Sequence, residues 1–324
     1  MMSLVRAFSY QRATSFAEAA ALLGHPDAQP LGGGTDLLVC VEEGLASPST
    51  LVDLRTIDGS DVLAELPRGG LRIAAAALIH DIAANPLVRQ RFPALALACE
   101  SVGSPALRHM GTIGGNLCQR PRCWYLRRAV PCLKNGGSTC PARDGENQYH
   151  AILEGGPCYI VHPSDPAVAL AALDARLEIT AGDATRTIPI AEFYVLPRDR
   201  MDLETVLRPG ELISGVVISG EAAGGRQLYR KLIQRGAWDF ALASIAGTRR
   251  ADGSVRMALG GVAPRPWRVP GSVEEDVASG GLDEDSILAL AERALYDAEP
   301  LSKNGYKIAL AASLLRDAMR ELSA

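Results

Sequence analysis

Residues 111–165 read GTIGGNLCQRPRCWYLRRAVPCLKNGGSTCPARDGENQYHAILEGGPCYIVHPSD and contain five of the chain's seven cysteines. The stretch opens on a glycine-rich turn and then alternates cysteines with glycines, prolines and basic residues. Because glycine and proline interrupt the periodicity of helices and strands, we expect a long irregular loop here. Its clustered cysteines indicate a loop folded around a bound group, since a disulfide framework is typical of small secreted domains.

Four of these cysteines, spaced C-x8-C-x7-C-x17-C, are the candidate metal ligands: Cys123, Cys132, Cys140 and Cys158. Structural zinc sites usually contain paired C-x2-4-C knuckles, and this loop has none. Four separated thiolates can instead surround an iron–sulfur cluster. The spacing leaves three alternatives open, namely a cluster, a zinc site, and reactive or disulfide-bonded cysteines. Cys118 follows the glycine turn directly and is predicted not to be a ligand.

Basic residues flank the cysteines, and we expect them to offset the negative charge of a thiolate-bound cluster. They are Arg120, Arg122, Arg127, Arg128 and Lys134. The two remaining cysteines, Cys40 and Cys99, lie in apolar surroundings, where a cysteine is expected to be a small buried hydrophobic residue.

A second glycine-rich turn lies about eighty residues before the loop, in QPLGGGTDLLVCV at 29–41. Consecutive glycine N–H groups form a concave anion site, Thr35 adds a hydroxyl, and Asp36 is placed to orient the turn or to meet a ribose. The turn at 111–117 offers the same elements through Thr112 and Asn116. Together the turns predict a dinucleotide whose pyrophosphate lies between them, although a glycine triplet alone also fits a plain tight turn. Neither turn matches G-x-G-x-x-G or a P-loop, which disfavours a Rossmann or Walker site.

Length and composition predict a globular chain of two or three domains. The 324 residues are 48% hydrophobic and 22% charged, with a net charge of −4 and 5% aromatic residues. This charge and composition argue against nucleic acid or an anionic membrane as a partner. No apolar run reaches the ~20 residues that a membrane span needs. The N-terminus lacks the apolar core of a signal peptide. We therefore expect a cytoplasmic chain, or a periplasmic one exported together with a partner that carries a signal.

Hydrophobic periodicity and turn residues predict an α+β fold. We expect helices at 16–24, near 79–90, at 93–102, 283–295 and 304–322, and strands at 50–57, 71–78 and within 207–218. The two strands at 50–57 and 71–78 are expected to flank a turn at 67–70. A run of small residues at 220–226 predicts a domain boundary. His80 is expected to be a capping or surface residue.

The order of the motifs provides a further indication. GGGTDLL, GTIGGNL, SDPAVAL, PGELI, YRKLIQRGAWDFALAS and GGVAPRP follow one another along the chain. In this order they resemble the FAD-binding subunit of the xanthine oxidase family of molybdenum hydroxylases. The cysteine-rich insertion resembles the cluster-bearing loop of periplasmic aldehyde oxidoreductases and of 4-hydroxybenzoyl-CoA reductases, and it is closer to the aldehyde type.

The resemblance implies a two-lobed FAD-binding domain of the PCMH-like type at 1–222, with lobes at about 1–56 and 57–222. Its iron–sulfur loop would cover residues 118–158. A small α+β domain of three strands and a helix bundle, similar to the C-terminal domain of CO dehydrogenase flavoproteins, would follow at 223–324.

The resemblance also implies the roles of individual residues. The four loop cysteines would hold a [4Fe-4S] cluster. The turn at 31–37 would bind the FAD pyrophosphate, Asp165 the polar middle of the cofactor, and Lys231 the ring or its polar edge. The complete set implied for FAD is Leu31, Gly32, Gly33, Gly34, Thr35, Asp36, Leu37, Thr112, Gly115, Asn116, Asp165, Ile213 and Lys231. One departure is the Pro30–Leu31 pair ahead of the glycines, where the family usually has small or branched residues.

The implied activity is electron transfer. Electrons would pass from two [2Fe-2S] clusters of a small subunit to FAD on this chain, and then to an external acceptor. Substrate chemistry would occur on a large molybdenum-cofactor subunit, so no catalytic residue is expected here. A second nucleotide motif is missing, which gives no support for NAD as the acceptor. The alternatives are the β subunit of a 4-hydroxybenzoyl-CoA reductase, another xanthine dehydrogenase-like hydroxylase, a flavin oxidoreductase acting alone, and a zinc-bound structural scaffold.

Overall fold

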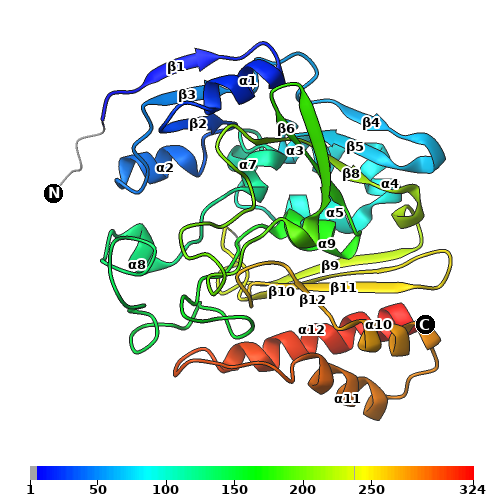
Figure 1. The fold of residues 1–324 in the computed structure, drawn as a ribbon. Coiled ribbons are helices and arrows are strands. Elements are labelled where there is room, and N and C mark those ends of the chain that lie inside the picture. Colours follow the sequence, from blue (N-terminus) through cyan, green and yellow to red (C-terminus); the bar gives the residue numbers. More distant parts are fainter. Residues whose placement is uncertain (1–5, 237) are drawn as a thin grey trace.

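Three β-sheets organise the described part of the chain, residues 6–236 and 238–324 of the computed structural model (Figure 1). The prediction that the N-terminus lacks a signal peptide involves residues 1–5, which lie outside the described residues. Among the helices that the structure describes, none combines the length and apolar character needed to cross a bilayer.

The first sheet is parallel, with strand order β1-β3-β2. Its strands are β1 (Ser9–Arg12), β2 (Ala28–Leu31) and β3 (Thr50–Asp53), accompanied by helices α1 (Phe16–Leu23) and α2 (Leu37–Glu42). Helix α1 begins where Ser15 caps it by accepting a hydrogen bond from the Glu18 N–H. Its buried alanines and Leu23 pack on the sheet to form a small separate core. In the sequence, β2 ends directly before the first glycine turn, and α2 follows that turn.

The second sheet is antiparallel and has the order β4-β5-β8-β6-β7. Its strands are β4 (Leu63–Glu65), β5 (Leu71–Ala74), β6 (Arg176–Ala181), β7 (Ala184–Pro189) and β8 (Leu212–Ile218). Helices α3 (Ile79–Ala84), α4 (Pro86–Arg91), α5 (Pro93–Glu100), α6 (Pro105–Arg108), α7 (Ile113–Leu117), α8 (Trp124–Arg127) and α9 (Asp165–Ala172) lie between its strands in the sequence. Helices α3, α5 and α9 contribute to the largest hydrophobic core.

Two predictions about this region were wrong in detail. The turn at 67–70 joins β4 to β5, and the strands predicted at 50–57 and 71–78 belong to different sheets. The short strand β4 was missed. The helix predicted near 79–90 is two helices, because Pro86 follows Asn85, which is extended and caps α4 through hydrogen bonds from the Leu87 and Val88 N–H groups.

The third sheet is antiparallel, with the order β12-β11-β10-β9. Its strands are β9 (Arg226–Leu232), β10 (Ala243–Arg249), β11 (Val255–Gly260) and β12 (Trp267–Arg268), followed by helices α10 (Gly271–Ser279), α11 (Glu284–Ala294) and α12 (Tyr306–Ser323). The fourth strand goes beyond the three expected from the resemblance. Helix α10 was missed because its sequence, GSVEEDVAS, is mostly polar.

The C-terminal sheet lies between two groups of helices (Figure 1). Helices α10 and α12 pack on one face and bury the C-terminal core, while α5 and α9 contact its strands from the other face. The sheet is therefore joined to the preceding part of the chain through α9. The predicted domain boundary near residue 222 stays a prediction.

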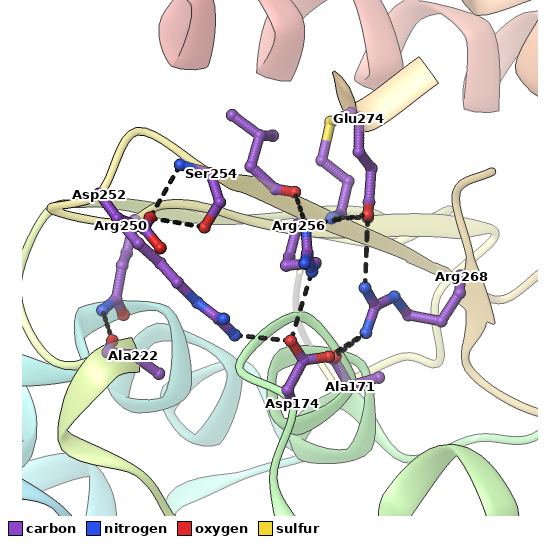
Figure 2. Close-up of polar contacts among 12 residues, drawn as sticks. Ala171, Asp174, Ala222, Arg250, Asp252, Ser254, Arg256, Arg268 and Glu274 are labelled. Carbon is purple, nitrogen blue, oxygen red and sulfur yellow. Dashed lines mark hydrogen bonds and ion pairs between the residues drawn. The ribbon is translucent and has the colours of Figure 1, made fainter. Parts of the chain in front are cut away.

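An ion-pair network at the end of α9 contributes to this junction (Figure 2). Asp174 accepts hydrogen bonds from Arg250, at 2.6 Å, and from Arg268. Arg268 also donates to the Ala171 carbonyl at 2.8 Å. Buried Glu274 of α10 accepts from the Met257 N–H at 2.7 Å and faces Arg268 at 3.4 Å. Burial would raise the pKa of Asp174, but Arg268 and Arg250 hold it below its ordinary value.

Candidate flavin and cysteine sites

A cavity of about 780 Å³ lies where the two glycine-rich turns meet β8 and β9. Every residue that the resemblance assigns to FAD lines it except Leu31, which is buried at the end of β2 and pairs with Asp53 of β3. Ile213 of β8 and Lys231 of β9 reach the cavity from strands distant in sequence. The tertiary structure thus brings the predicted residues together, and their individual contacts with the cofactor stay predictions.

The two turns contact each other through their backbones. A Cβ atom on Gly33 would lie 1.7 Å from the Met110 carbonyl oxygen, and one on Gly32 would lie 2.4 Å from the Thr112 hydroxyl. Gly34 has φ +72°, which side chains with a Cβ rarely adopt. Thr112 caps α7 and accepts a hydrogen bond from the Gly115 N–H at 3.2 Å. Both turns therefore present unobstructed backbone to the cavity, as a bound pyrophosphate requires.

Asp36 joins the first turn to the cysteine-rich loop. Its carboxylate accepts hydrogen bonds from the Arg127 guanidinium at 2.7 Å and from the Arg120 N–H at 2.8 Å. It also pairs with Arg122 at 3.0 Å. These contacts fit a role for Asp36 in orienting the turn, and its contact with a ribose stays a prediction.

Four of the basic residues near the cysteines are paired with carboxylates. Arg122 and Arg127 are paired with Asp36, while Arg120 and Lys134 are paired with Glu204. These cations were expected to offset the charge of a cluster, and that role stays a prediction. Their partners lie about 70 to 90 residues away in sequence, so sequence spacing offered no signal for these pairs.

A buried ion pair forms one wall of the cavity. Lys231 donates to the Asp165 carboxylate at 2.8 Å and to the Ser101 carbonyl at 3.1 Å. Tyr229 donates to the other carboxylate oxygen at 2.6 Å. Burial raises the pKa of Asp165 above its ordinary value, and Lys231 and Tyr229 offset part of that rise. Ser164, not Asp165, caps helix α9 and also donates to Asn116 at 2.5 Å.

The four candidate metal ligands approach one another on the loop. The side chains of Cys140 and Cys158 interact directly. Burial raises the pKa of Cys123, and nearby Cys140 and Cys132 raise it further. Contact with Cys158 lowers the pKa of Cys140 to about 6, and the same contact raises the pKa of Cys158. All four are free thiols. Within the described residues, no three His, Cys, Asp or Glu side chains converge closely enough to hold a single metal ion.

Helix α12 and the residues before it hold the loop in place. Lys307 is fully buried and donates from Nζ to the carbonyls of Tyr149, His150 and Gly261, at 2.7 to 3.2 Å. Burial lowers its pKa to about 7. Asn304 donates to the His150 carbonyl at 3.1 Å, and the His150 ring lies 3.3 Å from the Cys123 sulfur. The C-terminal part therefore holds the segment that contacts Cys123.

The structure also places the three remaining cysteines and His80. Cys40 and Cys99 are buried, as expected. Cys118 lines the larger cavity, and burial raises its pKa to about 12. His80 does not cap a helix; its ring is tilted against that of His109, with centroids 3.7 Å apart.

Comparisons with known proteins agree with this arrangement. Residues 6–218 match the family described as the FAD binding domain in molybdopterin dehydrogenase. The chain is 37% identical over 330 residues to the aldehyde oxidoreductase FAD-binding subunit PaoB of Escherichia coli strain K12, covering 99% of each. It is 26% identical over 300 residues to the glyceraldehyde dehydrogenase medium chain of Sulfolobus acidocaldarius, covering 91% of this chain and 89% of that one. A carbon monoxide dehydrogenase from Hydrogenophaga pseudoflava contains a chain of similar fold, with a TM-score of 0.75, 25% identity and 98% coverage of both chains.

The fold and the two-turn cavity thus define a flavin-binding oxidoreductase subunit. The chain belongs to the FAD-binding family of the molybdopterin dehydrogenases, and it is the FAD-binding medium subunit of a molybdenum hydroxylase of the xanthine oxidase family. The resemblance stated from the sequence and the α+β fold class are confirmed.

The contact between the turns leads to a first prediction. Gly33→Ala places a methyl group against the Met110 carbonyl, so the turns must separate. We expect FAD to bind at least about tenfold more weakly, a change of ~1.4 kcal/mol. The measurement is the FAD content of the purified complex and its retention on dilution. Gly271→Ala is the control, because a Cβ there meets nothing within 4 Å. Equal FAD retention in both variants would contradict the prediction.

The buried ion pair leads to a second prediction. Lys231→Met leaves a buried carboxylate unpaired, which costs on the order of 3 kcal/mol of unfolding free energy. Loss of the cation raises the pKa of Asp165 further, and a raised carboxyl pKa stabilises the fold at low pH and loses that contribution as pH rises. Denaturant unfolding should therefore show a larger deficit at about pH 8 than at about pH 5. Lys303→Met, which removes an exposed pair with Glu146, should cost less than about 1 kcal/mol. A deficit independent of pH would show that Asp165 does not take up the proton.

Proposed function

We propose that this chain is the electron-transfer flavoprotein subunit of a molybdenum-containing aldehyde oxidoreductase. It receives electrons from [2Fe-2S] clusters on a small partner subunit and passes them through FAD to an external acceptor. A large partner subunit with the molybdenum cofactor oxidises the aldehyde. The 37% identity over 99% of the chain to an aldehyde oxidoreductase FAD-binding subunit is the observation that carries this proposal.

The residues around the larger cavity fit FAD. The glycine turns lie close together beside the cavity, and a Cβ on Gly32 or Gly33 would push them apart and change the place offered to the pyrophosphate. Asp165 and Lys231 supply polar groups at the opposite wall, and Ile213 supplies an apolar surface. Bound FAD supplies an acceptor of single electrons that releases them as a pair. The protein holds the cofactor and excludes bulk water through the surrounding buried strands. We assign the FAD-binding domain to 1–222 and the C-terminal domain to 223–324.

We assign a [4Fe-4S] cluster to Cys123, Cys132, Cys140 and Cys158. Their mutual proximity, with Cys140 and Cys158 in direct contact, fits ligands that surround one group. Structural zinc sites usually contain paired C-x2-4-C knuckles, and the loop has none, which favours the cluster over the zinc scaffold.

Electron transfer can be tested on the purified complex. Adding an aldehyde under anaerobic conditions should bleach the flavin absorbance of the complex, whereas the isolated chain with FAD should show no change. The complex and the isolated chain should differ because the described residues of the larger cavity form a nucleotide site, while the aldehyde is oxidised on the large partner subunit. Bleaching in the isolated chain would show that it oxidises aldehydes by itself, and the proposal would then be wrong.

The cluster assignment has its own test. Cys132→Ser should lose most of the roughly four irons and acid-labile sulfides expected for each chain, together with the brown absorbance. Cys99→Ala is the matched control, because Cys99 is buried in the main core away from the loop. The measurement is iron, zinc and sulfide content of the anaerobically purified complex. Unchanged iron in Cys132→Ser, or one zinc in the unmodified complex, would refute the ligand assignment.

A further inference from the structure

A second cavity, of about 280 Å³, lies between the cysteine-rich loop and the C-terminal part of the chain. Cys123 lines it, and the cavity adjoins the larger flavin cavity, with which it shares six residues: Arg122, Pro163, Asp165, Arg235, Asp239 and Phe240. The guanidinium of Arg122 stacks over the Phe240 ring, 4.9 Å from its centroid. Because both residues line both cavities, this stacked pair lies at the boundary between them.

Several buried polar atoms around this cavity have no hydrogen-bond partner among the residues that the structure describes. They are Arg122 Nε, Gln148 Oε1, His150 Nδ1, His162 Nε2 and Ser244 Oγ. The side chains of His150 and His162 are more than nine-tenths buried. Buried polar atoms are nearly always paired, so a group of them around one cavity indicates a ligand that carries both donors and acceptors.

The cavity has little uncompensated charge. Arg122 is paired with Asp36, Arg235 with Asp239 at 3.5 Å, and Asp165 with Lys231. Burial lowers the pKa of His162 to about 3, so its ring is neutral. An ionic ligand would find no opposite charge free to meet it among these groups, which favours an uncharged ligand.

The walls also favour an aromatic ligand. Trp124, Tyr149 and Phe240 line the cavity, and the rings of Trp124 and Tyr149 pack edge to face with centroids 5.2 Å apart. Aromatic walls with a few polar groups are typical of sites for small planar molecules.

We propose that this cavity binds a small uncharged quinone and its quinol, with the quinone carbonyl oxygens directed to the unpartnered donors, the quinol hydroxyls donating to Gln148 Oε1, and the ring against the aromatic walls. The inference deepens the proposed function and rests on it, because the site lies between Cys123 and the flavin cavity. In the reaction, each quinone takes two electrons from the reduced flavin and two protons, and leaves as the quinol while the flavin returns to its oxidised form. The quinone class thus supplies the external acceptor.

The test uses the FAD-loaded complex and duroquinone, a benzoquinone whose four methyl groups leave no ring position open to cysteine addition. Because FAD fills the larger cavity of this complex, duroquinone binding measured by isothermal titration calorimetry reports on a second site. We expect one duroquinone per chain, and binding about tenfold weaker in His162→Leu, which loses one buried hydrogen bond. Gln148→Met should weaken binding of the quinol, durohydroquinone, and leave binding of duroquinone unchanged, because Gln148 Oε1 accepts hydrogen bonds and only the quinol can donate one. Gln90→Met, an exposed glutamine far from the cavity in the sequence, should bind like the unmodified complex.

The outcomes separate this inference from the proposed function. FAD and iron contents are measured on the same preparations, and their loss would refute the proposed function. If both are present and no binding heat is seen, the polar atoms hold only water and the quinone site is wrong. Equal affinity in all variants would place the quinone elsewhere in the complex, and binding of NADH in place of duroquinone would show a charged nucleotide site. Each of these three results overturns the inference.

Discussion

The backbone contact between the two glycine-rich turns is the constraint on which the rest of the structure depends. Gly33 lies so close to the Met110 carbonyl that no side chain can stand between them. This contact joins the parallel lobe of β1–β3 to the helices that follow β5, and it leaves backbone exposed along one side of a large cavity. The flavin site thus lies at a junction between lobes. Glycines line it there, and because they lack side chains a cofactor can approach the main chain closely.

Asp36 extends that junction to the cysteine-rich loop. Its carboxylate pairs with Arg122 and Arg127, which lie on the segment that carries Cys123. From the opposite side, Lys307 of α12 holds the same loop through three carbonyls. Ile152 and Leu153 of the loop are buried in the C-terminal hydrophobic core, and these polar contacts add to that anchor. The proposed flavin and cluster sites are therefore connected through charged and backbone groups.

Several features were predictable because they depend on local chemistry. The glycine turns, the helix at 16–24 and the long helix near the C-terminus follow from turn residues, a serine cap and helical periodicity. Strand β4 and helix α10 were missed because each is short or polar and is stabilised by its neighbours. Strands 50–57 and 71–78 were recognised, but their assignment to different sheets depends on pairing with β1, β2 and β8, which local pattern does not encode.

By itself, the sequence determined the residue types of the two sites, because backbone freedom at glycine and thiol chemistry at cysteine belong to single residues. The tertiary structure alone decided which cation meets which anion. Asp36 orients the loop, Lys231 pairs with Asp165, and neutral polar groups surround a second cavity. These relations join residues tens of positions apart, and burial, which sets their charge and their need for partners, arises only when the lobes pack.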